Sequence, residues 1–158
     1  PQIFLAVDFC DLNAASVQES SLVQLMEYLA HECAFVLPPD ANDEDEIRRD
    51  FNEFLSASDG ILVYLGEAGL QWAGQQLRQV LKKRLPLERC CFVAPPPQKA
   101  GPGGELSLDR ETFLPWTLFR LNDPNLHTAF CVEGFDKREL KPWLDRLKTK
   151  VHRKPDGS

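Results

Sequence analysis

Hydrophobic positions along the chain follow two alternating patterns, one typical of buried strands and the other of amphipathic helices. Short continuous apolar runs, which are typical of strands that a parallel sheet covers on both faces, recur along the chain. They span residues 3–7, 34–37, 61–65, 90–94 and 128–132. Between and after these runs, apolar residues return every three or four positions, which is the spacing of one helix face. The predicted helices span residues 16–33, 47–57, 72–84 and 140–151.

The order of these elements predicts an α/β fold. Strands that alternate with helices form a parallel sheet with helices on both faces. Five strands in one domain fit the flavodoxin-like, three-layer α/β/α arrangement with strand order 2-1-3-4-5. The stretch 98–121 interrupts the alternation, because it is rich in glycine and proline and contains Pro115 within an apolar run. Since 158 residues are about the size of one domain, we expect a single domain over residues 1–151 and a tail or linker over residues 152–158.

The composition narrows the classes of partner. Asp and Glu number 24 and Lys and Arg number 18, so the net charge is −6. This acidity argues against non-specific binding to nucleic acid or to an anionic membrane surface. No apolar run approaches the roughly 18 residues that span a bilayer, so we expect no membrane domain. The five cysteines include no CxxC pair, and we therefore expect reduced thiols, several of them buried, in a cytoplasmic protein.

The charge is unevenly distributed along the chain. Residues 40–46 contain five acids, and we expect them to form an interaction loop that passes into the start of a helix, where carboxylates are favoured. The predicted interaction residues are Asp40, Asn42, Asp43, Glu44, Asp45 and Glu46. Three bases at the end of the third predicted helix, Lys82, Lys83 and Arg84, form a candidate counter-patch. Contact between the two would give head-to-tail association, which can build open filaments. The alternative is that both segments are solvated.

Ligands of a doubly wound sheet meet the loops at the carboxyl ends of its strands. The first of these loops contains acids and no glycine, so it lacks the glycine-rich turn that cradles phosphate in many proteins of this fold. The candidate pocket at this edge contains Asp8, Trp72 and Gln76. We predict no metal site, because His127 and Cys131, four residues apart on a strand, would lie about 13 Å from each other.

Residues 51–77 are the most specific part of the sequence. They read as a helix ending Ser-x-Ser-Asp, an apolar strand, a short loop, and then Trp72 opening the next helix. This arrangement resembles the central part of Toll/interleukin-1 receptor (TIR) domains. It is most similar to the divergent TIR-like modules of bacterial signalling and defence proteins, which are often attached to STAND-type NTPases. The order of strands and helices agrees with the family over about residues 3–150, and the resemblance implies a role in assembling signalling complexes.

The resemblance also implies where an enzymatic TIR domain would carry its catalytic acid. In TIR domains that cleave NAD, a tryptophan on the helix after the third strand is followed four residues later by a catalytic glutamate. Trp72 matches the tryptophan, but the residue four positions on is Gln76, which cannot stabilise a developing oxocarbenium ion as a carboxylate would. NAD hydrolysis is therefore an alternative only with a displaced acid, Glu67. A nucleoside deoxyribosyltransferase-like enzyme, which opens with a similar strand, is a further alternative.

These observations predict a non-enzymatic TIR-like interaction module. We expect it to need no cofactor and to act by self-association or by binding a protein partner. NAD would bind only if the chain were the alternative, an NAD hydrolase. The chain opens at Pro1-Gln2 without an initiator methionine. We therefore expect it to be a piece of a longer or processed polypeptide, whose other domains would be its partners.

Overall fold

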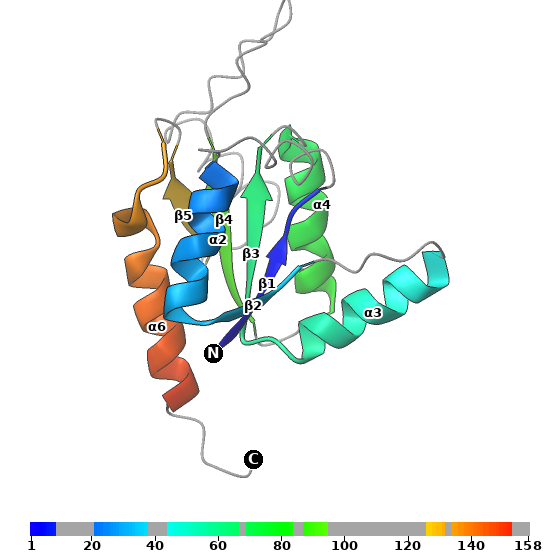
Figure 1. The fold of residues 1–158 in the computed structure, drawn as a ribbon. Helices are drawn as coiled ribbons and strands as arrows, with labels where there is room; N and C mark the ends of the chain where they lie inside the picture. The colour runs from blue at the N-terminus through cyan, green and yellow to red at the C-terminus, as the bar shows by residue number, and fades with distance from the viewer. Residues whose placement is uncertain are drawn as a thin grey trace, which may run out of the picture.

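The strands form one parallel sheet in the computed structural model, which describes residues 1–8, 21–37, 44–66, 69–83, 87–94, 126–131 and 134–152. Within this part of the chain, the sheet has five strands in the order β2-β1-β3-β4-β5 (Figure 1). The strands are β1 (Gln2–Ala6), β2 (Ala34–Val36), β3 (Gly60–Leu65), β4 (Glu88–Val93) and β5 (His127–Phe130). The helices are α2 (Ser21–Glu32), α3 (Glu44–Ser56), α4 (Gly69–Lys82), the 3-10 turn η1 (Lys137–Glu139) and α6 (Lys141–His152). The predicted flavodoxin-like fold and its strand order are confirmed.

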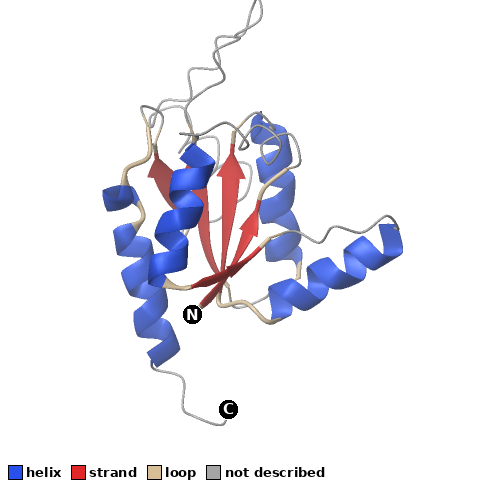
Figure 2. Cartoon of the chain, in the orientation of Figure 1, coloured by secondary structure: helices blue, strands red, loops and turns tan. Residues whose placement is uncertain are grey.

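Helices cover both faces of the sheet and divide the interior into two cores (Figure 2). Successive residues of a strand point to opposite faces. On β1, Ile3 and Leu5 therefore point into the core beneath α2 and α6, whereas Phe4 and Ala6 point into the core beneath α3 and α4. We call these the α2–α6 core and the α3–α4 core. All six residues of β3 are buried, which explains why the strands read as continuous apolar runs.

Some predicted boundaries need small corrections. The fourth strand begins at Glu88, two residues earlier than predicted, because the backbones of Glu88 and Arg89 pair with β3. The last helix continues to His152, one residue beyond the predicted end of the domain. Residues 16–20 of the first predicted helix and the irregular stretch 98–121 lie outside the described residues.

The start of β3 is where β1, β3 and α6 meet. The backbone N–H of Gln2 donates to Asp59 Oδ2 at 2.9 Å, and the backbone N–H of Asp59 donates to the Gln2 carbonyl at 2.7 Å. The next residue, Gly60, faces α6. A Cβ at this position would lie 3.1 Å from Trp143 Cζ2 and 3.3 Å from Leu147 Cδ1. A glycine therefore fits here because the side chains of α6 pack directly on the backbone of β3.

Several thiols are buried, as predicted. Cys90 and Cys91 are adjacent on β4, fully buried, and point into opposite cores. Cys131 is buried in the α2–α6 core, and Cys33 is half-buried beside it; all four are free thiols. Burial raises the pKa of Cys91 to about 12 and also holds the pKa of Cys90 well above its usual value. Neither strand thiol is a nucleophile in the folded protein at neutral pH.

The buried thiol of Cys91 predicts a loss of stability at alkaline pH. Its folded-state pKa is raised from 9.0 to about 12, so above pH 9.0 the unfolded chain loses a proton that the folded chain keeps. The stabilising contribution is complete below that pH and is lost as the pH rises, at about 1.4 kcal/mol per unit. Between about pH 8 and about pH 10.5, the free energy of unfolding should fall by about 2 kcal/mol more in the wild type than in Cys91→Ala. Urea unfolding under reducing conditions measures this, and equal losses in the two proteins would contradict it.

Candidate functional site

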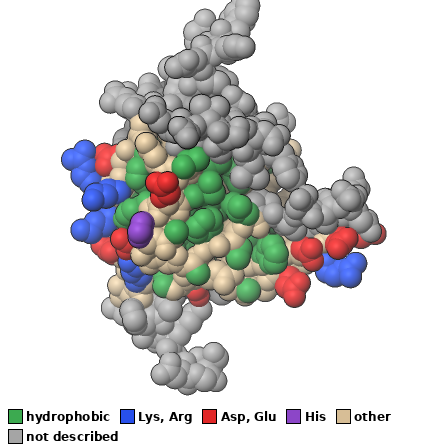
Figure 3. Space-filling model, viewed as in Figure 1, with side chains coloured by type: hydrophobic (Ala, Val, Ile, Leu, Met, Phe, Trp, Pro, Cys, Tyr) green, Lys and Arg blue, Asp and Glu red, His purple; other side chains and the backbone are tan. Residues whose placement is uncertain are grey.

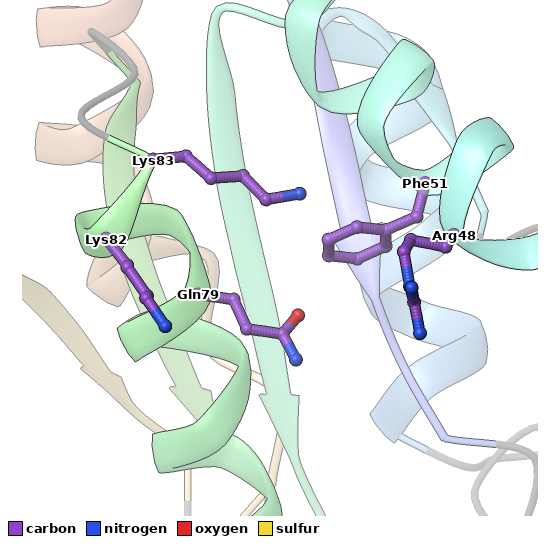
Figure 4. A pocket seen from close by; sticks show the side chains of 5 residues that line it. All are labelled: Arg48, Phe51, Gln79, Lys82 and Lys83. Carbon is purple, nitrogen blue, oxygen red and sulfur yellow. The ribbon is translucent and has the colours of Figure 1, made fainter.

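The candidate site is a groove between α3 and α4. It has a volume of about 510 Å³ and is lined by Arg48, Phe51, Gln79, Lys82 and Lys83. The first two residues come from α3 and the others from the C-terminal end of α4 (Figure 4). Figure 4 shows the Lys83 side chain and the Phe51 ring pointing toward each other from the two helices, with Arg48 beside the ring. We call this site the α3–α4 groove.

The placement of α3 creates the groove. The C-terminal half of the helix is anchored on the sheet, because the ring centroids of Phe51 and Phe54 lie 5.2 Å and 6.4 Å from that of Phe4. Leu55, in the last turn, is fully buried. The N-terminal end of α3 lies well away from the sheet (Figure 1). Since α3 diverges from α4, the side chains between the two helices line an open groove instead of packing together.

The cations of the groove come from two helices. The Lys83 ammonium lies 5.2 Å from the centroid of the Phe51 ring, which is a cation–π distance. Burial, followed by the positive charge of Arg48, lowers the pKa of Lys83. Lys82 and Lys83 are favoured by their position at a helix C-terminus, where the dipole attracts positive charge. That explanation does not extend to Arg48, which belongs to the second turn of α3.

No carboxylate balances these charges within the part of the chain that the structure describes. Among the described residues that line the groove, none is Asp or Glu, and no described ion pair involves Arg48, Lys82 or Lys83. The groove is therefore locally positive on a chain whose net charge is −6. A concave surface of one sign attracts ligands of the other, so the arrangement is suited to an anionic group.

A second basic pocket, beneath the C-terminal end of α2, provides a contrast. It has a volume of about 220 Å³ and is lined by Tyr28, Glu32, Lys137, Arg138 and Lys141. Figure 3 shows Lys and Arg side chains gathered on the side of the molecule formed by η1 and α6. Here two of the charged residues are paired: Lys148 binds Glu32, which lowers the pKa of that carboxyl, and Arg138 lies 3.0 Å from Asp136. This α2–η1 pocket is therefore closer to electrical balance than the α3–α4 groove.

The predicted acidic interaction loop is partly helical. Glu44, Asp45 and Glu46 are the first three residues of α3, and at this end the helix dipole favours the carboxylates of Asp45 and Glu46. Asp45 and Glu46 are exposed. Glu46 precedes Arg48 by two residues, or about 200° around the helix, so it points away from the groove. The remaining predicted residues, Asp40, Asn42 and Asp43, lie outside the described residues.

Two of the three residues of the predicted basic counter-patch line the groove. These are Lys82 and Lys83, while Arg84 lies outside the described residues. Sequence reasoning missed Arg48 and Phe51, which form the opposite wall. A pair of basic residues, Arg48 and Arg49, within a mostly acidic helix was the signal, but only the packing of α3 against the sheet places Arg48 next to α4.

The candidate pocket at the carboxyl edge of the sheet is only partly described. Trp72 and Gln76 lie four residues apart, and so on the same side of α4; both are half-buried, and Trp72 packs against the α3–α4 core. Asp8 follows β1 and is half-buried. Glu67, the displaced acid of the NAD alternative, lies outside the described residues, as do loops 9–20 and 95–125. Trp72 therefore has a packing role, and the joining of these residues into one pocket stays a prediction.

Metal-ligating residues are not clustered among the described residues, where no group of three or more His, Cys, Asp or Glu is placed to hold an ion. His127 and Cys131 contact different backbone carbonyls: His127 Nε2 lies 2.7 Å from the Glu139 oxygen, and Cys131 Sγ donates to the Asp136 oxygen at 3.7 Å.

None of the described helices is long and apolar enough to cross a membrane. Comparison of the chain with protein-family models, curated proteins and solved structures gives no match.

Proposed function

We propose that the chain is a non-enzymatic, TIR-like interaction module that assembles head to tail, with the acidic segment 40–46 of one copy in the α3–α4 groove of the next. The observation that carries this proposal is the positive charge of the groove, which no carboxylate balances among the described residues. The resemblance of residues 51–77 to TIR domains supports the class. Under this proposal the chain is a cytoplasmic signalling or defence module without a cofactor, and its partners include other domains of a longer chain.

The groove and part of the acidic segment belong to the same helix, and Glu46 lies on the side of that helix opposite to the groove. Arg48 and Phe51 of α3 face α4 across the groove, whereas Glu46 points to the opposite side of α3. Asp45 and Glu46 are exposed at the end of α3 that lies away from the sheet (Figure 1). Glu46 therefore cannot enter the groove of its own copy. Contact between copies is heterologous, so each added copy leaves one groove and one acidic segment unused, and growth continues unless the contact closes a ring.

Self-association of the wild-type chain is the first expected result. Exposed charge pairs are individually weak and are screened by salt, so the contact should be reversible and strongly dependent on ionic strength. In light scattering at low ionic strength, the weight-average mass should rise with protein concentration. Salt at about 0.5 M reduces the Debye length to about 4 Å and should remove the rise. A monomer at every concentration in low salt would rule the proposal out.

Charge reversal of either half of the contact gives the sharper test. Lys82→Glu/Lys83→Glu removes the receiving groove, and Asp45→Lys/Glu46→Lys removes the inserting segment. Each double variant should stay monomeric, while an equimolar mixture of the two should associate, because the intact acidic segment of one variant meets the intact groove of the other. Circular dichroism confirms that both are folded. The control is Lys137→Glu/Lys141→Glu in the α2–η1 pocket, which changes the net charge by the same amount and should leave association intact. An equal loss in this control would show that net charge alone governs association.

A further inference from the structure

We propose that the α3–α4 groove also binds a small ligand that carries adjacent phosphate groups. The site is the groove to which the proposed function assigns the acidic segment, so the ligand and that segment would compete. Phosphate binding itself needs only one copy of the chain and does not depend on assembly.

The donors that line the groove match a ligand with many oxygens. Arg48 offers five N–H donors, Lys82 and Lys83 offer three each, and the Gln79 amide offers two more. They come from two helices that face each other across the groove. Each carboxylate of the acidic segment carries one charge and two oxygens, and these charges are spread along a peptide backbone. Adjacent phosphate groups carry several charges and oxygens, and can contact both helices at once.

The crowding of positive charge favours an anion between the helices. Burial, and to a smaller extent the charge of Arg48, lowers the pKa of Lys83, so the ammonium is held where its charged form is disfavoured. A polyanion in the groove reverses this effect, because it attracts both cations and reduces their mutual repulsion. Among the described residues no carboxylate already does so. The groove therefore gains more from a bound polyanion than separate, fully solvated lysines would.

The size and lining of the groove fit a small molecule. Its volume of about 510 Å³ lies within the range of roughly 300–1,000 Å³ that is typical of ligand sites. The half-buried Phe51 ring provides an apolar wall beside the cations. Two sources of adjacent phosphates meet these conditions: a free oligophosphate, and the phosphate chain of a nucleotide whose base lies against Phe51.

Calorimetric titration of the 158-residue chain with tripolyphosphate, without divalent cations, tests the site. We expect saturable binding of one ligand per chain. Arg48→Ala and Lys83→Ala should each weaken binding about tenfold or more, because each removes a charge-assisted hydrogen-bond donor. The matched control, Lys137→Ala/Lys141→Ala, should change binding by less than about twofold, since its charges lie outside the groove. Absence of saturable binding, or equal weakening in the control, would overturn the proposal.

A second titration, with ATP, distinguishes the two sources. If Phe51→Leu weakens binding of ATP but not of tripolyphosphate, the groove holds a nucleotide base against Phe51. If both ligands respond alike, the phosphate chain is the whole ligand. Glu46→Lys separates this proposal from the proposed function, because position 46 points away from the groove: this variant should bind tripolyphosphate like the wild type while assembling less. Assembly of the wild type without tripolyphosphate binding would overturn the ligand site alone.

Discussion

Replacing Trp143 with alanine is expected to lower the free energy of unfolding by about 3–5 kcal/mol. Trp143 is fully buried and is the largest such side chain in the described part of the chain. Its side chain belongs to the α2–α6 core, where the ring would lie 3.1 Å from a Cβ at Gly60. Truncation therefore opens a cavity between α6 and the start of β3. Urea denaturation followed by far-ultraviolet circular dichroism measures the loss without relying on the fluorescence of the removed indole.

Trp143→Phe is the matched second variant, because the buried indole Nε1 has no hydrogen-bond partner among the residues that the structure describes. An unpaired buried donor costs about 1–3 kcal/mol, and phenylalanine removes it while keeping most of the apolar volume. The phenylalanine variant should therefore lose less than half of the free energy that the alanine variant loses. Equal losses would show that the indole N–H is satisfied in solution.

A double-mutant cycle with Gly60→Ala tests the contact itself. An added methyl at Gly60 meets the Trp143 ring at 3.1 Å and the Glu88 carbonyl oxygen at 3.2 Å. Gly60→Ala should destabilise the wild type. It should cost less in the Trp143→Ala background, where the ring no longer blocks the methyl group. Strict additivity of the two changes would mean that the rest of the site, and not Trp143, excludes a side chain at Gly60.

The strands and their order were predictable because burial on both faces leaves a direct trace in the sequence. β3 is buried along its whole length, so residues 61–65 form a continuous apolar run. The start of β4 was harder to place, since Glu88 and Arg89 are polar and only half-buried. Their strand conformation comes from backbone pairing with Gly60 and Ile61, which leaves no pattern in the side chains.

The groove was not predictable because it depends on how two helices diverge. The sequence shows Lys82 and Lys83 as a basic cluster at the end of a helix, and it shows Arg48 and Arg49 as two bases among acids. It does not show that these residues face each other. That arrangement requires the C-terminal half of α3 to be held on the sheet while its N-terminal half leaves it, and the residue that holds it is Phe4, far away in the sequence.

Phe4→Ala is therefore expected to lower the free energy of unfolding by about 3–5 kcal/mol and to loosen α3 in particular. Phe4 is fully buried, and its ring centroid lies 5.2 Å from that of Phe51 and 6.4 Å from that of Phe54. Without this ring, the anchored half of α3 loses its aromatic contact with β1, and Phe51 no longer has a fixed position in the groove. Amide hydrogen exchange should show faster exchange in α3, and binding of tripolyphosphate should weaken with it.

Phe92→Ala is the matched control for this prediction. Phe92 is equally buried, but it lies in the α2–α6 core, where its ring centroid is 5.5 Å from that of Tyr64 and 6.2 Å from that of Phe135. It should cost a similar free energy of unfolding, about 3–5 kcal/mol, while speeding exchange in α2 and α6 and leaving the groove intact. If Phe4→Ala does not fold, Phe4→Leu should show the same preference for α3 at a smaller cost. Equal loosening of α3 in the Phe4 and Phe92 variants would mean that the two cores unfold as one unit, and that α3 is not anchored by Phe4.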